Sequence, residues 1–104
     1  MTNDNSAPIT LEDGPSKGRY VLAMDGAEAE LTFTKVGAGQ IILDHTGVPD
    51  AFRGRGVGER LVEHAVKQAR AAGKTVIPLC PFAKAQFERH PEWADVLRRP
   101  SQKR

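Results

Sequence analysis

The sequence predicts a single α/β domain whose mixed sheet has about four strands, in the order β-β-β-α-β-α. Two features predict it: a two-residue alternation of apolar side chains up to about residue 48, and a three- and four-residue spacing from residue 57 onward. At 104 residues the chain has room for one domain. Hydrophobic residues make up 39% and charged residues 27%, a balance typical of chains that fold.

Three strands are expected in the first half of the chain. Residues 20–24 alternate, Asp25-Gly26 gives a hairpin turn signal, and residues 27–34 alternate again. A glycine-rich turn at 37–39 then leads to residues 41–48, which are apolar on both faces. A strand that is apolar on both faces is expected near the centre of a sheet.

Two helices and a fourth strand are expected in the second half. An amphipathic helix begins at residue 57, and Gly73 is placed to end it. A strand follows at 75–80, and a second helix runs from 81 to about 90 between two prolines. Because a helix joins the strands at 41–48 and 75–80, we expect a right-handed crossover and parallel pairing of these strands.

The two ends of the chain are predicted to be tails. Residues 1–17 are rich in polar residues, proline and glycine and show no periodicity, so a flexible tail is expected there. Residues 98–104 form a short basic tail, which leaves residues 18–97 as the domain. A single cysteine and apolar runs of only a few residues predict a cytoplasmic protein that does not cross a membrane.

The most informative segment lies between the third strand and the first helix and reads Arg53-Gly54-Arg55-Gly56-Val57-Gly58. A helix N-terminus presents unpaired N–H groups and a partial positive charge, and both favour a phosphate group. Glycines let an anion approach these amides, and Arg53 and Arg55 add positive charge. The loop therefore predicts a pyrophosphate site.

Two common nucleotide loops are excluded by what this segment lacks. A P-loop requires Lys-Ser or Lys-Thr after its last glycine, where this chain has Glu59-Arg60. A dinucleotide fingerprint requires G-x-G-x-x-G and an acidic residue about 20 positions later. This chain has G-x-G-x-G, followed at that distance by Lys74-Thr75-Val76. Neither nucleotide class fits.

The same loop resembles the coenzyme A loop of the GNAT acyltransferase superfamily, Gln/Arg-x-x-Gly-x-Gly/Ala, with Arg53, Gly56 and Gly58 at the defined positions. The resemblance extends over about residues 18–97, as in short single-domain members with a cysteine after the last core strand. It is carried by the segments Leu43–Thr46, Val48-Pro49, Phe52–Gly58, Leu79–Phe82 and His90–Trp93.

This resemblance implies an acetyl-CoA-dependent N-acetyltransferase with its cleft between the strands at 41–48 and 75–80. The amides of residues 53–58 would hold the pyrophosphate of acetyl-CoA. The backbone at the end of the strand, around Val48, would align the pantetheine and polarise the thioester carbonyl. The acetyl group would pass to a primary amine.

Cys80 ends the fourth strand and directly precedes a helix. Ligands bind at this edge of open α/β sheets, and a helix N-terminus favours thiolate. Such a thiolate is suited to take the acetyl group and pass it to an amine, or the thiol is suited to protonate the departing coenzyme A sulfur. The other interpretation of a lone cysteine is a small buried core residue.

His45 lies two positions after Leu43, so regular alternation places both side chains on one face of the strand. If that face lines the cleft, His45 is a candidate to accept a proton from the amine or to orient Cys80. Asp44 is expected on the opposite face. A purely structural role for His45 also remains open.

No metal site is expected. Successive separations of 19, 16 and 10 residues along His45, His64, Cys80 and His90 match no compact ligand motif. The aromatic residues of the C-terminal segment are expected to pack in the core rather than stack on bases: Phe82, Phe87 and Trp93.

Two other functions remain open at this point. One is a coenzyme A-binding module without catalysis. The other is a nucleic-acid accessory protein, suggested by Arg53-Gly54-Arg55-Gly56 and the basic tail. A net charge of only +2 argues against nucleic acid. The expected acceptor is a small-molecule or peptide amine, and both a monomer and a homodimer remain open.

Overall fold

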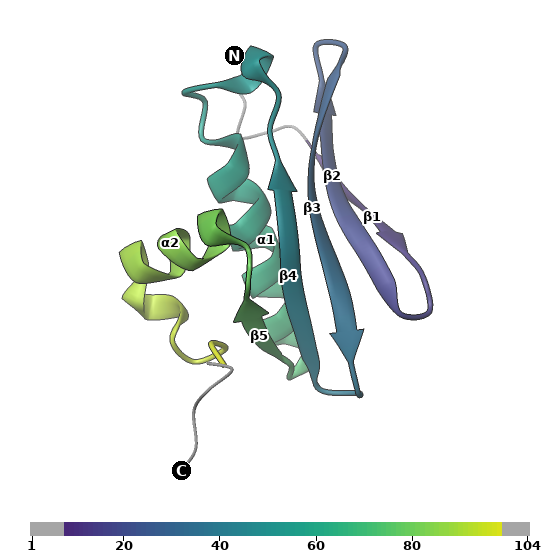
Figure 1. Cartoon of the computed structure of the whole chain (residues 1–104), viewed down its shortest axis with the longest axis vertical. Helices are drawn as coiled ribbons and strands as arrows, with labels where there is room; N and C mark the ends of the chain where they lie inside the picture. Colours follow the sequence, from purple (N-terminus) through teal and green to yellow (C-terminus); the bar gives the residue numbers. More distant parts are fainter. Residues whose placement is uncertain (1–7, 99–104) are drawn as a thin grey trace.

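The computed structural model describes residues 8–98 (Figure 1). Within this range the chain forms five strands, two α-helices and two short 3₁₀ helices. In chain order these are β1 (Ile9–Asp13), β2 (Lys17–Met24), β3 (Ala27–Val36), β4 (Gln40–Gly47), η2 (Asp50–Phe52), α1 (Val57–Ala72), β5 (Thr75–Pro78), α2 (Pro81–Arg89) and η3 (Pro91–Trp93).

The strands form one mixed sheet in the order β1-β2-β3-β4-β5. The first four strands pair antiparallel with their neighbours. β4 and β5 pair parallel, from Gln40 opposite Thr75 to Leu43 opposite Pro78. The predicted α/β class, the order of the elements after residue 18 and the parallel pairing across α1 are confirmed.

The prediction of a flexible tail over residues 1–17 is wrong for residues 9–13. β1 pairs with β2 from Ile9 opposite Leu22 to Asp13 opposite Gly18, so the sheet has five strands rather than four. β1 lies at the edge of the sheet and is largely exposed, and it therefore shows little apolar alternation. Residues 1–7 of the predicted tail and residues 99–104 of the basic tail lie outside the described residues.

One face of the sheet is covered by α1, which packs against β2 and β3 (Figure 1). This helix runs with its buried side toward the sheet, as its three- and four-residue apolar spacing predicts. Burial of each large side chain here contributes about 1.5–3 kcal/mol. The fully buried core side chains are Leu22, Leu31, Leu43, Phe52, Val57, Leu61, Val62, Val66 and Val76.

The C-terminal part of the chain packs beside β5. α2 contacts α1, β4 and β5. After η3, the amide of Val76 donates to the carbonyl of Val96 (2.7 Å), and the amide of Arg98 donates to the carbonyl of Val76 (2.8 Å). The outer edge of β5 is therefore partly paired with the last described residues, which protects it from other chains.

The predicted turns are confirmed by backbone geometry. Asp25 and Gly26 have φ values of 54° and 79° in the hairpin between β2 and β3. Two successive positive φ values are characteristic of a type I′ turn, which matches the twist of the flanking strands. Gly73 has φ 72° and ends α1.

The turn between β3 and β4 allows a matched test of backbone strain. Gly37 has φ 60°, whereas Gly39 lies outside the left-handed region, and a Cβ atom added to either would meet nothing within 4 Å. We expect Gly37→Ala to lower the free energy of unfolding by about 1–2 kcal/mol. Gly39→Ala should change it by less than about 0.5 kcal/mol. Urea unfolding measures both, and equal losses would contradict the assigned turn geometry.

Candidate functional site

The site is built where β4 and β5 separate. Their parallel pairing stops at Leu43 and Pro78, but β4 continues to Gly47. The amide of Cys80 donates to the carbonyl of Leu43 (3.0 Å) and makes the last backbone link between the two segments in the described chain. Beyond this bond the strands diverge, and their carboxyl ends lead to the N-termini of α1 and α2 (Figure 1).

A β-bulge in β4 determines which of its side chains lie on the α1 side of the sheet, where β4 and β5 separate. The register between β3 and β4 shifts, so that Leu43 is opposite Phe33 but Thr46, not His45, is opposite the buried Leu31. Paired residues share a face of the sheet. Thr46 therefore lies on the α1 side together with Leu43.

The prediction that His45 shares a face with Leu43 is wrong. His45 is opposite Thr32 and lies exposed on the other face of the sheet, because the bulge adds one residue and reverses the alternation. Asp44 accepts a hydrogen bond from the Thr34 hydroxyl (2.7 Å) on that same open face. The geometry offered for a catalytic His45 beside Cys80 is therefore absent.

Cys80 lies in the divergence and is only 5% exposed. Its Sγ is 3.4 Å from the Thr46 hydroxyl, a contact that the sequence analysis did not identify. Burial raises the pKa of the Cys80 thiol, but the Thr46 hydroxyl and the amides of Ala83, Phe82 and Thr46 outweigh burial, so the pKa is lower than the usual value. Within residues 8–98 no side-chain hydrogen bond caps α2, and the partial positive charge of this helix N-terminus also favours thiolate at Cys80.

The glycine-rich loop ends in a helix N-terminus with unpaired amides. Gly56 is the N-cap residue in the left-handed conformation (φ 72°), and no side chain of the described residues caps α1. No backbone carbonyl within residues 8–98 accepts from the amides of Val57, Gly58 or Glu59. These N–H groups are those that a helix leaves for an anion.

The two arginines of the loop differ in their contacts. Arg53 has an 80% exposed side chain and pairs with Asp50 (3.0 Å). Arg55 pairs with Asp25 of the β2–β3 hairpin (3.3 Å), and its guanidinium lies 5.6 Å from the centre of the Phe52 ring. Arg55 therefore fastens the loop to the hairpin, whereas Arg53 extends into solvent.

Phe82 covers part of this loop, which the sequence did not reveal. A Cβ atom added to Gly58 would lie 2.7 Å from the Phe82 ring and 3.4 Å from a Val48 methyl group. Glycine at position 58 thus allows the ring to rest on the first turn of α1. Phe82 is nevertheless 39% exposed, so the prediction of core packing is confirmed for Phe87 and Trp93 but not for Phe82.

Gln86 is a second residue that sequence analysis missed. It is the one buried polar residue found within residues 8–98, with 6% of its surface exposed, and its Oε1 atom is buried without a hydrogen-bond partner. An unpaired buried polar group costs about 1–3 kcal/mol. The only signal in the sequence is its spacing, three residues after Ala83 and one before Phe87, on the buried side of α2.

His90 fastens the far end of α2 to α1. Its Nε2 atom lies 2.7 Å from Glu59 and its Nδ1 atom 3.0 Å from Glu92, and the ring stacks on Trp93 with centres 4.1 Å apart. Hydrogen bonds to Glu92 and Glu59 raise the pKa of His90, although burial opposes them. These contacts account for His90 without a metal.

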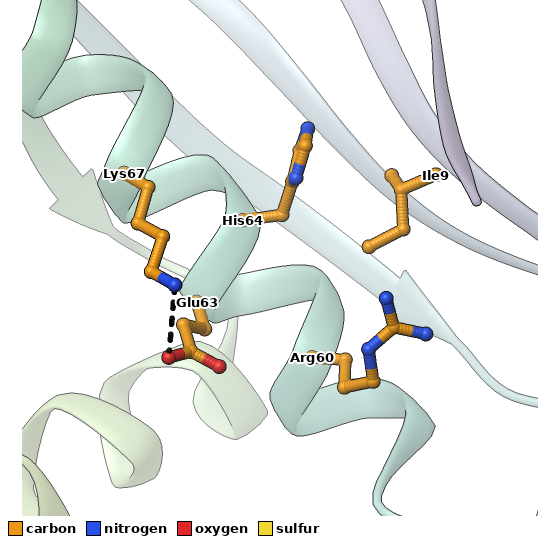
Figure 2. Close-up of a pocket in the computed structure, with 5 residues that line it drawn as sticks. All are labelled: Ile9, Arg60, Glu63, His64 and Lys67. Atoms are coloured by element: carbon orange, nitrogen blue, oxygen red, sulfur yellow. Dashed lines mark ion pairs between the residues drawn. The ribbon is translucent and has the colours of Figure 1, made fainter. Parts of the chain in front are cut away.

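His64 lines a separate hollow of about 380 Å³ between α1 and β1 (Figure 2). Its ring meets Tyr20 edge-on at 5.1 Å. Burial, with smaller effects of Arg60 and Lys67, lowers the pKa of His64. In the part of the chain that the structure describes, no three His, Cys, Asp or Glu side chains are grouped to hold a metal ion.

Comparison with known proteins agrees with this geometry. The family described as GCN5-related N-acetyl-transferase matches residues 19–96. The chain belongs to this family. A solved structure of a GCN5-like protein from Staphylococcus aureus is 31% identical, with a TM-score of 0.66, and the match covers 98% of this chain and 95% of that one.

Curated relatives are more distant. Protein NATD1 of Xenopus tropicalis is 35% identical over 65 residues, which is 61% of this chain and 60% of that protein. Protein NATD1 of Homo sapiens is 32% identical over 65 residues, which is 61% of this chain and 58% of that protein. The match thus spans about 60% of the length of these relatives. Among residues 8–98, neither helix has the length and apolar character needed to cross a membrane.

The Thr46 hydroxyl is expected to control the ionisation of Cys80. Thr46→Val removes a donor to the thiolate, so the thiol pKa should rise and the alkylation rate at neutral pH should fall several-fold. The pH dependence of alkylation by iodoacetamide measures this effect. Thr32→Val is the matched control, because the Thr32 hydroxyl donates to the His45 carbonyl away from the sulfur. Unchanged reactivity in Thr46→Val would refute the assigned interaction.

Proposed function

We propose that this protein is an acetyl-CoA-dependent N-acetyltransferase that transfers the acetyl group to a primary amine. One observation carries the proposal: the amides of the first turn of α1, unpaired within residues 8–98, and the Cys80 thiol beside Thr46 lie at the same diverging end of β4 and β5. An acyl carrier needs an anion site for its pyrophosphate and a reactive position for its thioester, and both are offered at this edge.

The carrier is held by the loop at residues 53–58 and by the end of β4. Amides of Val57, Gly58 and Glu59 would donate to the pyrophosphate, and the exposed Arg53 would add charge. The arm of the carrier would then run past Val48 toward Cys80. For this the Phe82 ring must leave Gly58, since an anion at these amides and the ring compete for the same bare glycine surface.

The Cys80 route uses the thiolate as nucleophile. The sulfur attacks the thioester carbonyl, the bond between the acetyl carbon and the coenzyme A sulfur breaks, and coenzyme A leaves as a thiolate that takes up a proton. A neutral amine then attacks the acetyl-cysteine, loses a proton to solvent and releases the Cys80 thiolate. In the direct route the neutral amine attacks the thioester carbon of the carrier and the carbon–sulfur bond breaks. Cys80 protonates the departing sulfur, and the proton that the attacking nitrogen loses to solvent restores the thiol by exchange.

A second hollow supports an amine acceptor. A cavity of about 480 Å³ opens on the face of the sheet opposite α1, at the end of β4. Arg19 there is hydrogen-bonded to Glu12 and Glu30, so carboxylates outnumber the cation. A negative surface attracts a protonated amine, and this one lies at the end of β4, on the face of the sheet opposite Thr46 and Cys80. The hollow is lined by Arg19, Glu28, Glu30, Gly47, Val48 and Pro49.

Intact-protein mass spectrometry after incubation with acetyl-CoA tests the covalent route. We expect the wild-type protein to gain one acetyl mass on Cys80, and Cys80→Ala to bind coenzyme A but gain none. Turnover is measured with a panel of primary amines, as the rate at which free coenzyme A is released. Cys80→Ala should lower turnover by about 10²-fold or more if the thiolate is the nucleophile.

The other outcomes separate the alternatives. Full turnover in Cys80→Ala would exclude an essential acetyl-cysteine and leave the direct route. Tight coenzyme A binding in calorimetry without transfer to any amine would identify a non-catalytic binding module. Absence of coenzyme A binding by the wild-type protein would refute the proposed function altogether.

A further inference from the structure

Gln86 is placed against the part of α1 that is proposed to bind the carrier. Phe82, Gln86 and His90 follow one another at four-residue intervals and so lie along one side of α2. Both ends of this row touch the first turn of α1, since Phe82 rests on Gly58 and His90 bonds Glu59. Gln86 lies between them in this row and is buried, with 6% of its surface exposed.

The carboxamide of Gln86 is not explained by the fold itself. Its Oε1 atom is fully buried and accepts no hydrogen bond within the described chain. Buried polar side chains in folded proteins nearly always have a partner. A methionine or leucine would fill a similar volume without this cost, so the buried acceptor points to a donor from outside the described chain.

We propose that Gln86 positions the acyl carrier by accepting a hydrogen bond from an amide N–H of its pantetheine arm. This inference rests on the proposed function. Phosphate groups carry no donor at neutral pH, whereas the arm offers amide N–H groups, so an orphaned acceptor matches the arm and not the pyrophosphate. Movement of Phe82 away from Gly58 opens the adjacent position on the same row of α2 to the arm.

A comparison of two ligands tests this assignment. Coenzyme A and ADP both carry adenosine and a pyrophosphate, but ADP lacks the arm. In calorimetry we expect Gln86→Met to weaken coenzyme A binding by about three- to tenfold, the worth of one net hydrogen bond, and to leave ADP binding unchanged. Thermal unfolding of the free Gln86→Met protein should occur at the same or a higher temperature, because the orphaned acceptor is gone.

Gln68→Met is the matched control, because Gln68 is an exposed residue on α1. It should change neither the affinity for coenzyme A nor that for ADP. Equal weakening of both ligands by Gln86→Met, or no weakening of either, would overturn the inference while leaving the proposed function intact. If the wild-type protein binds neither ligand, both the inference and the proposed function fail.

A ligand-side test avoids any change to the protein. Coenzyme A analogues in which one or the other arm amide is replaced by an ester lack the corresponding N–H donor. One of these analogues should bind the wild-type protein about three- to tenfold more weakly than coenzyme A does. The Gln86→Met protein should bind that analogue and coenzyme A with equal affinity. Equal affinity of the wild-type protein for coenzyme A and both analogues would overturn the assignment even if Gln86→Met failed to fold.

Discussion

The end of the parallel pairing between β4 and β5 is the constraint on which the site depends. Pro78 has no N–H group to continue the ladder, and the chain then turns so that Cys80 makes the last bond to Leu43. Because each of these parallel strands is followed by a helix, two helix N-termini meet at this edge. Their partial positive charges favour an anion at α1 and a thiolate at α2, so one topological feature places both preferences at the same edge of the sheet.

Most of the fold was predictable because its signals are local. The Asp25-Gly26 turn, the amphipathic spacing of α1 and the glycine stop at Gly73 each reflect a short-range preference of the backbone. β1 gave no such signal, since an exposed edge strand needs no apolar face. The sequence also identified the glycine-rich loop and Cys80 as candidate site residues. It could not predict the bulge that places Thr46 instead of His45 on the α1 side of the sheet, because a bulge depends on the register with the neighbouring strand.

The contact between Phe82 and Gly58 gives the glycine loop two uses. In the free protein the glycine allows an aromatic ring to cover the start of α1, which shields part of an apolar surface that also includes Val48. The same absence of a side chain is what an anion requires to reach the helix amides. Under the proposed function, binding of the carrier would exchange this van der Waals contact for hydrogen bonds to the helix amides.

The two ends of α2 are held in different ways. Near its start, Cys80 is a buried thiol with a lowered pKa, and Phe82 is partly exposed where its ring rests on Gly58. Its far end is held by Trp93 and by the bond from His90 to Glu59. Because its carboxylate partners raise the pKa of His90, this bond contributes fully below about pH 6.5, the usual histidine pKa, and is lost as the pH rises through the raised value. The contact that the proposed carrier would displace, Phe82 on Gly58, is thus separate from the contacts of His90 and Trp93 that hold the far end of α2.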